Sequence, residues 1–228
     1  MPEPSQYPIF LDLVQCPVLV VGGGAVALRK TRGLLQAHAR VTVVAPEFCA
    51  GFKELKGFDR ITAPYAATHM TMKMWRLVFI TTNDQAVNDT VQKHAAAHGI
   101  FSCRSDEHEL GDFSGGAAWV SDSGHVTIAV ATAGASPAIA MRIRDAAVAG
   151  VDSSLIAWAA LIGPWRKRTK REVRDPVARR ELLSRISGPA MEECLRAGGE
   201  AAATALFNEW LAELHASTAL NRVPDHGK

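Results

Sequence analysis

Three consecutive glycines, at positions 22–24, mark the stretch of this chain that is best suited to hold a ligand. Gly22, Gly24 and Ala27 fit the spacing G-x-G-x-x-[G/A] within the segment VLVVGGGAVALRK. The first glycine allows a tight turn, the second lets the backbone approach a pyrophosphate, and the small third residue lets a helix pack closely on a strand. Free N–H groups at Ala25 and Val26, in the first helical turn, would bind the phosphates. The pattern predicts dinucleotide binding, and a glycine turn without a ligand is the alternative.

Two further strand ends should lie beside this turn. The apolar run RVTVVA leads into Pro46 and Glu47. The run LVFITT ends with Thr81 and Thr82, just before Asn83. Because the carboxyl ends of parallel strands meet at one edge of a sheet, we expect these residues to bind the cofactor. Many NAD sites carry an acid at the end of the second strand for the ribose hydroxyls, and Glu47 is the nearest one here. Since no arginine stands there for a 2′-phosphate either, spacing alone leaves NAD and NADP open.

An acid-rich segment, SDEHELGD, follows a further apolar run at 100–103. Asp106 is its first acid, and a carboxylate placed after a parallel strand can act as a general base. On the residue pattern alone, a solvated loop is the commoner explanation. Because the unperturbed pKa of histidine lies near neutrality, His108 could move a proton, but a lone surface histidine is the commoner case. Cys103 and His108 are too few for a metal site, so we expect a small buried thiol at Cys103 and predict no metal ligands.

A parallel sheet is needed to bring these residues together. Apolar runs alternate with helical patterns through the first half of the chain, a rhythm that is typical of an α/β fold with helices on both faces of the sheet. Strands are predicted at 17–21, 40–45, 60–64, 77–82 and 100–103, and helices at 25–38 and 84–98.

The pattern changes after residue 113. Two β-rich runs, 117–120 and 125–131, are joined by a polar turn, and Ser136 with Pro137 is a good start for a helix. From about residue 151 only helices are expected, with breaks at 163–164, 175–176, 188–189 and 198–199. The predicted organisation is a Rossmann-like dinucleotide-binding domain (1–113), a small β-containing region (114–150), an all-helical C-terminal domain (151–220) and a frayed tail (221–228).

The composition excludes several classes of protein. The chain has 228 residues, 48% of them hydrophobic, and its formal net charge of +2 gives no general nucleic-acid signature. The four cysteines are scattered, which favours reduced thiols in a cytoplasmic protein. Neither a signal-peptide pattern nor an apolar run of membrane-spanning length is evident, so no membrane partner is expected.

Several blocks of the sequence resemble the precorrin-2 dehydrogenase module of siroheme synthases. The similarity covers about residues 7–150 and departs from the family at Cys103, His108, Gly116 and Ala133, around the expected substrate pocket. The blocks are PIFLDL, PVLVVGGGAVALRKTRGLL and ARVTVVAPE near the N-terminus, TTNDQAVND against A-T-D-D-x-x-V-N, IFSCRSDEHELGDF against I-F-x-N-V-V-D-D-P-x-x-x-x-F, and VTIAVATAGASPAIAMRIRD against L-x-I-A-I-S-T-G-G-x-S-P-x-L-A-x-x-I-R.

The resemblance implies a homodimeric, NAD-dependent enzyme that oxidises precorrin-2 to sirohydrochlorin, with residues 114–150 as the dimerisation region. Asp106 aligns with the family's catalytic aspartate, which implies a base for the protons that the oxidation releases. Some members also insert ferrous iron, so a bifunctional dehydrogenase and ferrochelatase is an alternative. A non-catalytic dinucleotide-sensing domain is the alternative from another class. The chain ends where a fused siroheme synthase would begin its methyltransferase, which favours the stand-alone form.

The resemblance also suggests where a polyanionic tetrapyrrole would bind. Thr132, Gly134 and Ser136 precede a helix whose free N–H groups could hold a substrate carboxylate, although an ordinary capped helix explains them equally well. Arg142 and Arg144 are candidates for bidentate pairing with carboxylates. The basic segment 164–180 fits a solvated helix face or a surface that attracts the anionic substrate. Its lack of interleaved aromatic residues beyond Trp165 argues against nucleic acid.

Overall fold

The computed structural model describes residues 6–107 and 110–220 of the chain. It divides into two compact units, and each is described by itself. The first unit comprises residues 1–116 with 131–137, and the second comprises residues 117–130 with 138–228.

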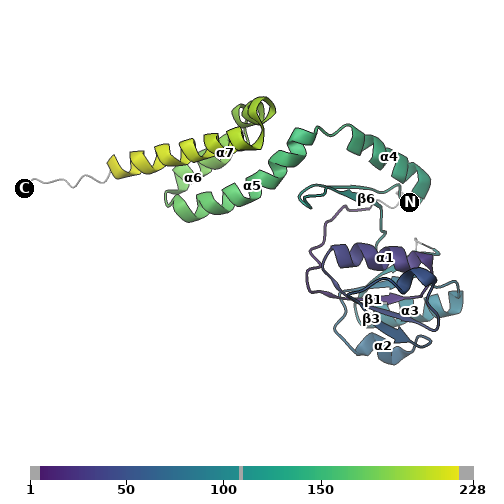
Figure 1. The fold of residues 1–228 in the computed structure, drawn as a ribbon. Coiled ribbons are helices and arrows are strands. Elements are labelled where there is room, and N and C mark those ends of the chain that lie inside the picture. Colours follow the sequence, from purple (N-terminus) through teal and green to yellow (C-terminus); the bar gives the residue numbers. More distant parts are fainter. Residues whose placement is uncertain (1–5, 108–109, 221–228) are drawn as a thin grey trace, which may run out of the picture. The chain divides into compact units, whose positions relative to one another are not determined.

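A five-stranded parallel sheet forms the centre of the first unit (Figure 1). The strand order is β3-β2-β1-β4-β5, and every neighbouring pair is parallel. The sequence therefore predicted all five strands, although the third and fourth end two residues earlier than expected. The strands are β1 (Pro17–Val21), β2 (Arg40–Ala45), β3 (Asp59–Thr62), β4 (Leu77–Ile80) and β5 (Phe101–Arg104).

Helices cover both faces of this sheet, which is why its central strands are apolar at nearly every position. Successive side chains of a strand point to opposite faces. Val18 and Val20 of β1 accordingly pack in the cluster that contains Ala27 and Leu34 of α1 (Ala25–Gln36) and Phe52 of the short 3₁₀ helix η1 (Ala50–Phe52). In Figure 1, α1 lies above the strands and α2 lies below them.

The opposite face packs against the two remaining helices of the unit. Leu19 and Val21 of β1 share a cluster with Met70 of α2 (Ala67–Thr71) and with Val91 and Ala95 of α3 (Gln85–Ala97). The strand order reverses at β1, because the chain proceeds outward to β2 and β3 and then returns to β4 on the other side. In open α/β sheets, ligands bind beyond the carboxyl ends of the strands at such a switch point. The glycine turn follows β1 at that position.

The second unit begins with an antiparallel strand pair and ends with helices. Thr127 pairs with Val120, so the polar turn between the strands forms a hairpin as predicted. No single helix among the described residues is long and apolar enough to cross a membrane, although α4 and α5, bent by 82° at their junction, meet the length and composition test as a pair. The elements are β6 (Ala117–Val120), β7 (Thr127–Val130), α4 (Pro137–Ala149), α5 (Ser153–Glu172), α6 (Pro176–Arg185) and α7 (Pro189–Leu220).

One predicted helix break, at residues 163–164, is wrong. Helix α5 continues through Pro164, although a proline inside a helix removes one hydrogen bond and costs about 3 kcal/mol. The apolar face of α5 outweighs this cost: Trp165 is 5% exposed and stacks on Phe207 of α7 at a centroid distance of 5.1 Å. The break at 175–176 is confirmed, because the Asp175 side chain caps α6. The breaks at 188–189 and 198–199 are confirmed by the start of α7 and by a left-handed Gly199.

Candidate functional site

A pocket of about 630 Å³ lies at the carboxyl edge of the parallel sheet. Its walls come from the turn after β1 and from the segments that follow β2, β3 and β4. The structure brings together every residue that the sequence predicted to bind the cofactor: Gly22, Gly24, Ala25, Val26, Pro46, Glu47, Thr81, Thr82 and Asn83 all line this pocket.

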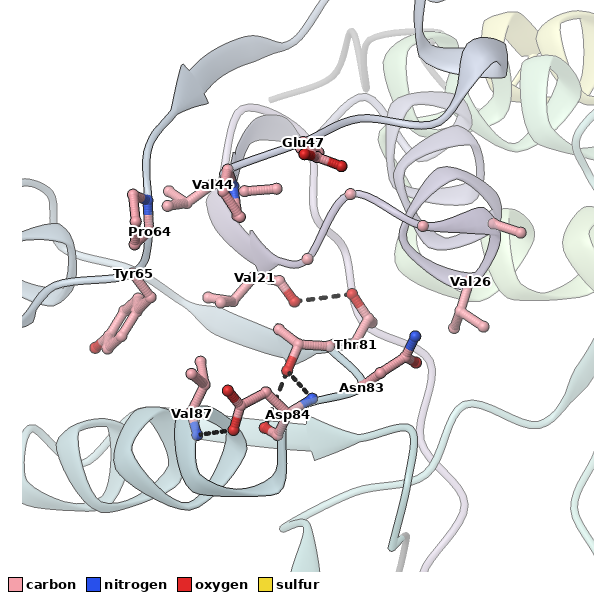
Figure 2. A pocket seen from close by; sticks show the side chains of 17 residues that line it. Val21, Val26, Val44, Glu47, Pro64, Tyr65, Thr81, Asn83, Asp84 and Val87 are labelled. Carbon is pink, nitrogen blue, oxygen red and sulfur yellow. Dashed lines mark hydrogen bonds between the residues drawn. The ribbon is translucent and has the colours of Figure 1, made fainter.

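Several lining residues were missed by the sequence analysis. Pro64 and Tyr65 follow β3, and Val87 lies in the first turn of α3. Figure 2 shows Pro64 and Tyr65 on one side of the pocket and Val26 and Asn83 on the other. The carboxyl end of the predicted third strand was the signal that could have identified Pro64 and Tyr65, since all parallel strands end at the same edge.

The three glycines of the turn have different roles. Gly22 has φ of +125°, and a Cβ there would lie 2.5 Å from Oγ1 of Thr81. A Cβ on Gly23 would lie 1.9 Å from the carbonyl oxygen of Glu47, whereas one on Gly24 would meet no atom within 4 Å. Gly22 and Gly23 are therefore required by the fold, because β4 and the segment after β2 approach the turn closely. Gly24 alone borders open space, as expected where a ligand approaches the backbone.

The start of α1 is suited to a phosphate group. Gly24 is the N-cap of α1, no side chain caps this end, and the first turn contains no acidic residue. The first N–H groups of a helix have no intrahelical partner and carry partial positive charge, which favours an anion. The residues present thus fit the diphosphate of a dinucleotide.

The charges of the pocket favour a cofactor without a 2′-phosphate. Its described lining contains the acids Glu47 and Asp84 but no arginine, lysine or histidine. The Asp84 carboxylate accepts a hydrogen bond of 3.1 Å from the backbone N–H of Val87, which fixes it as the cap of α3. Glu47 is exposed just after β2, at the end that commonly carries a ribose-binding acid.

Tyr65 gives the pocket an aromatic wall. Its hydroxyl lies 3.0 Å from Nδ1 of His94, and its ring centroid lies 5.9 Å from those of His69 and His94. Burial raises the pKa of Tyr65 to about 12, so the phenol stays neutral at physiological pH. A neutral aromatic ring with two proline neighbours in the same lining, Pro46 and Pro64, can pack against a planar base.

Asp106 follows β5 and is held by a buried arginine. The Nε and Nη2 groups of Arg104 donate to Oδ1 and Oδ2 of Asp106 at 3.0 and 2.5 Å. The Asn88 amide also donates to Oδ2, at 2.9 Å, and to the carbonyl oxygen of Thr82 at 3.1 Å. Asp106 does not line the pocket itself, but Asn88 links it to Thr82, which does.

This pairing makes Asp106 a fixed anion. The Arg104 guanidinium holds the pKa of the Asp106 carboxyl well below its usual range, and the Asn88 hydrogen bond acts in the same direction. In turn, Asp106 raises the pKa of Arg104. An ionised carboxylate that already accepts several hydrogen bonds is a weak base, which takes a proton only from a group that is itself acidic. The general-base role of Asp106 stays a prediction.

The other acids and the thiol in and beside the loop after β5 either have structural roles or lie outside the described residues. The Asp112 carboxylate accepts hydrogen bonds of 2.8 Å from both the backbone N–H and the hydroxyl of Ser102, so it anchors the loop to β5. Cys103 is 3% exposed within the core, which confirms the buried thiol, and burial raises its pKa. His108 and Glu109 lie outside the described residues. Among the described residues, no group of three or more His, Cys, Asp and Glu side chains could hold a metal ion.

The predicted substrate residues before α4 form a compact turn. The Thr132 hydroxyl donates to the Ser136 carbonyl at 3.1 Å and accepts from the Ser136 N–H at 3.2 Å, while Gly134 has φ of +86°. The Thr132 side chain is therefore engaged within this turn. Arg142 is exposed on α4, and Arg144 pairs with the neighbouring Asp145 at 2.5 Å.

Comparisons with known proteins agree with this geometry. Residues 9–117 match a family model described as "Putative NAD(P)-binding". The chain is 38% identical to a siroheme synthase of Methylococcus capsulatus over 204 residues, which are 88% of this chain and 42% of that protein. It is 33% identical to siroheme synthase 1 of Aeromonas salmonicida over 210 residues, which are 90% of this chain and 44% of that protein. The chain thus spans less than half the length of these relatives.

A solved structure covers the fold more completely. SirC, precorrin-2 dehydrogenase, matches with a TM-score of 0.69 and 25% sequence identity, over 92% of this chain and 100% of that chain. The parallel sheet, the small antiparallel strand pair and the helical C-terminal region all belong to this match, which confirms the predicted fold class.

Proposed function

The chain belongs to the family that comprises precorrin-2 dehydrogenases and the N-terminal module of siroheme synthases, and we propose that it oxidises precorrin-2 to sirohydrochlorin with NAD. The observation that carries this proposal is the pocket at the switch point of the sheet. The predicted cofactor residues converge there, and Asn88 links their Thr82 to the Asp106 carboxylate.

We assign the residues of the pocket to parts of the cofactor by their chemistry. Gly24, Ala25 and Val26, at the uncapped start of α1, would hold the diphosphate. Pro46 and Glu47 would hold the ribose next to the adenine, and Thr81, Thr82 and Asn83 would contact the half that reacts. When bound, NAD supplies the hydride acceptor for the oxidation.

Asp106 is the residue that we assign to charge stabilisation and proton loss. Removal of hydride from precorrin-2 leaves a positively charged conjugated system. The proton that this system must still lose to become sirohydrochlorin is then acidic. A carboxylate with a lowered pKa can accept such a proton, and as a fixed anion it also stabilises the positive charge as it develops. A weak base therefore suffices if hydride leaves first.

We propose further that the chain forms a homodimer through residues 114–150 and acts in the cytoplasm. An isolated two-stranded ribbon such as β6–β7 is marginally stable, and α4 buries only Ala140 among its residues. Val120, Met141 and Ile143 are 53%, 45% and 48% exposed. A second copy would cover these apolar side chains. Sedimentation should show a dimer for the wild type and a monomer for Met141→Glu with Ile143→Glu, whereas a monomeric wild type contradicts the proposal.

Anaerobic incubation of precorrin-2 with NAD tests the activity. We expect the spectrum of sirohydrochlorin to appear with the absorbance of NADH, and a parallel reaction with Fe²⁺ tests the ferrochelatase alternative. Binding of NAD without any oxidation of precorrin-2 would contradict the proposal and favour a dinucleotide-sensing domain.

A further inference from the structure

We propose that Arg104 is a positioning residue for the dehydrogenation, whose guanidinium fixes the Asp106 carboxylate in one orientation beside the cofactor pocket. This inference rests on the proposed function. It concerns a residue that the family resemblance does not predict, because the pattern I-F-x-N-V-V-D-D-P has valine at the position of Arg104.

The contacts of Arg104 restrain it on three sides. Its side chain is 1% exposed at the carboxyl end of β5, and its two-point contact with Asp106 leaves Nη1 to donate to Asp89 on α3 at 2.6 Å. A planar guanidinium that binds one carboxylate at two points and a second carboxylate at a third cannot rotate without breaking an ion pair. Arg104 thereby ties the loop after β5 to α3.

Asn88 completes the restraint of Asp106. Oδ1 accepts from Nε of Arg104, whereas Oδ2 accepts from both Arg104 and Asn88. The backbone N–H groups of Asp106 and Glu107 also bind this carboxylate, so its rotation would lose at least one hydrogen bond. Asn88 is 1% exposed and is itself fixed to the backbone of Thr82. The side chain of Asp106 remains 27% exposed, so its outer surface is accessible to a ligand.

The arrangement has more carboxylates than cations. Arg104 faces two acids, Asp89 on α3 and Asp106 in the loop. Glu107 is a third acid next to Asp106 in the chain, and its carboxylate accepts a hydrogen bond of 2.8 Å from the neutral Gln85 amide. The described charged groups around Asp106 are therefore Arg104, Asp89 and Glu107. Without Arg104, the neighbouring acids and partial burial would favour protonation of Asp106, against the remaining hydrogen bonds from Asn88 and from two backbone N–H groups.

Kinetics of Arg104→Gln and Arg104→Lys test the proposal. In Arg104→Gln we expect unchanged NAD affinity and a fall in kcat of about 10²-fold, the usual effect of a misplaced reacting group. Its kcat should also decrease as the pH falls from 7 toward 5, because Asp106 then takes up a proton, whereas the wild-type kcat should not show this decrease. Arg104→Lys keeps the charge but loses the two-point contact, so it should lose kcat while keeping most of the wild-type pH profile.

Arg60→Gln provides the matched control. Arg60 on β3 donates to the Phe52 carbonyl at 2.7 Å and lies over the rings of Phe48 and Phe58, so this change removes a structural guanidinium from the same sheet without touching Asp106. Its kcat and pH profile should match the wild type even where its melting temperature falls.

The outcomes separate this inference from the proposed function. A wild type that does not oxidise precorrin-2 overturns both. An active wild type overturns the role of Arg104 alone if folded Arg104 variants keep kcat and the pH profile, or if they lose only thermal stability as Arg60→Gln does. If Arg104→Gln fails to fold, the kcat of Arg104→Lys and the wild-type pH profile test the role of Arg104. A wild-type kcat that falls between pH 7 and 5 through protonation of Asp106 contradicts the proposal.

Discussion

Replacement of Gly24 by aspartate should separate cofactor binding from folding. Gly24 is the N-cap of α1 with φ of −80° and ψ of −171°, an extended conformation that any residue adopts, and a Cβ there meets no atom within 4 Å. Asp and Asn are both favoured N-caps, so the free energy of unfolding should stay unchanged or rise by about 0.3 kcal/mol. In Gly24→Asp, a carboxylate would then occupy the phosphate end of the pocket.

The size of the effect on binding follows from the charges. Two unit charges about 4 Å apart interact by about 4 kcal/mol at an effective dielectric constant of about 20, and salt weakens this interaction. We therefore expect repulsion of the diphosphate to weaken NAD binding by about 2–4 kcal/mol, which is about 30- to 1,000-fold in Kd. Gly24→Asn has the same shape without the charge and should lose less than about tenfold.

Isothermal titration calorimetry with NAD and urea unfolding of both variants provide the two measurements. Wild-type affinity in a folded Gly24→Asp protein would refute the assignment of the diphosphate to the start of α1. Equal losses in Gly24→Asp and Gly24→Asn would show that volume rather than charge is decisive there.

Four further predictions concern the other residues of the site. Gly22→Ala should lower the free energy of unfolding by more than about 2 kcal/mol in urea, because of its left-handed φ and the contact with Thr81; an unchanged midpoint would contradict this. Glu47→Gln should reduce an at least tenfold preference for NAD over NADP in kcat/KM, and a wild-type preference for NADP would contradict the pocket charges. Asp106→Asn should keep NAD affinity while kcat falls about 10²–10⁴-fold; unchanged kcat would leave the carboxylate without a role. Since the pKa of Tyr65 is raised to about 12, the unfolded chain loses this proton first, so stability should fall as the pH rises from about 10 to 12, and less in Tyr65→Phe.

Local sequence signals located the pocket at the sheet edge, although they missed Pro64, Tyr65 and Val87 in its lining. Its glycines and strand ends lie within short segments whose periodicity defines both the strands and the edge where they meet. The same signals could not identify the contact of Gly23 with the Glu47 backbone, because that contact depends on how closely the segment after β2 approaches the turn. They also misplaced a break at Pro164, where packing of Trp165 outweighs the local effect of proline.

The environment of Asp106 was not predictable from the sequence. Arg104 forms ion pairs with Asp106, two residues later in the chain, and with Asp89 on α3. The second ion pair depends on the packing of α3 against β5, which the sequence does not show. Asp112 belongs to the same acidic run as Asp106 but lies outside the family motif position, so the sequence predicts little effect from its replacement. The structure instead uses Asp112 to anchor the loop to Ser102, so an Asp112→Asn variant is not a neutral control for Asp106→Asn.

An anaerobic single-turnover experiment tests the central claim most directly. Enzyme in excess over precorrin-2 is mixed with NAD, and NADH and sirohydrochlorin are measured together for the wild type, Gly24→Asn and Gly24→Asp. The account predicts one NADH for each sirohydrochlorin in the wild type. At limiting NAD, it predicts the same stoichiometry in Gly24→Asn at a rate reduced by less than about tenfold, and little product in Gly24→Asp. Sirohydrochlorin formed without NADH, or formed equally fast by Gly24→Asp, would contradict it.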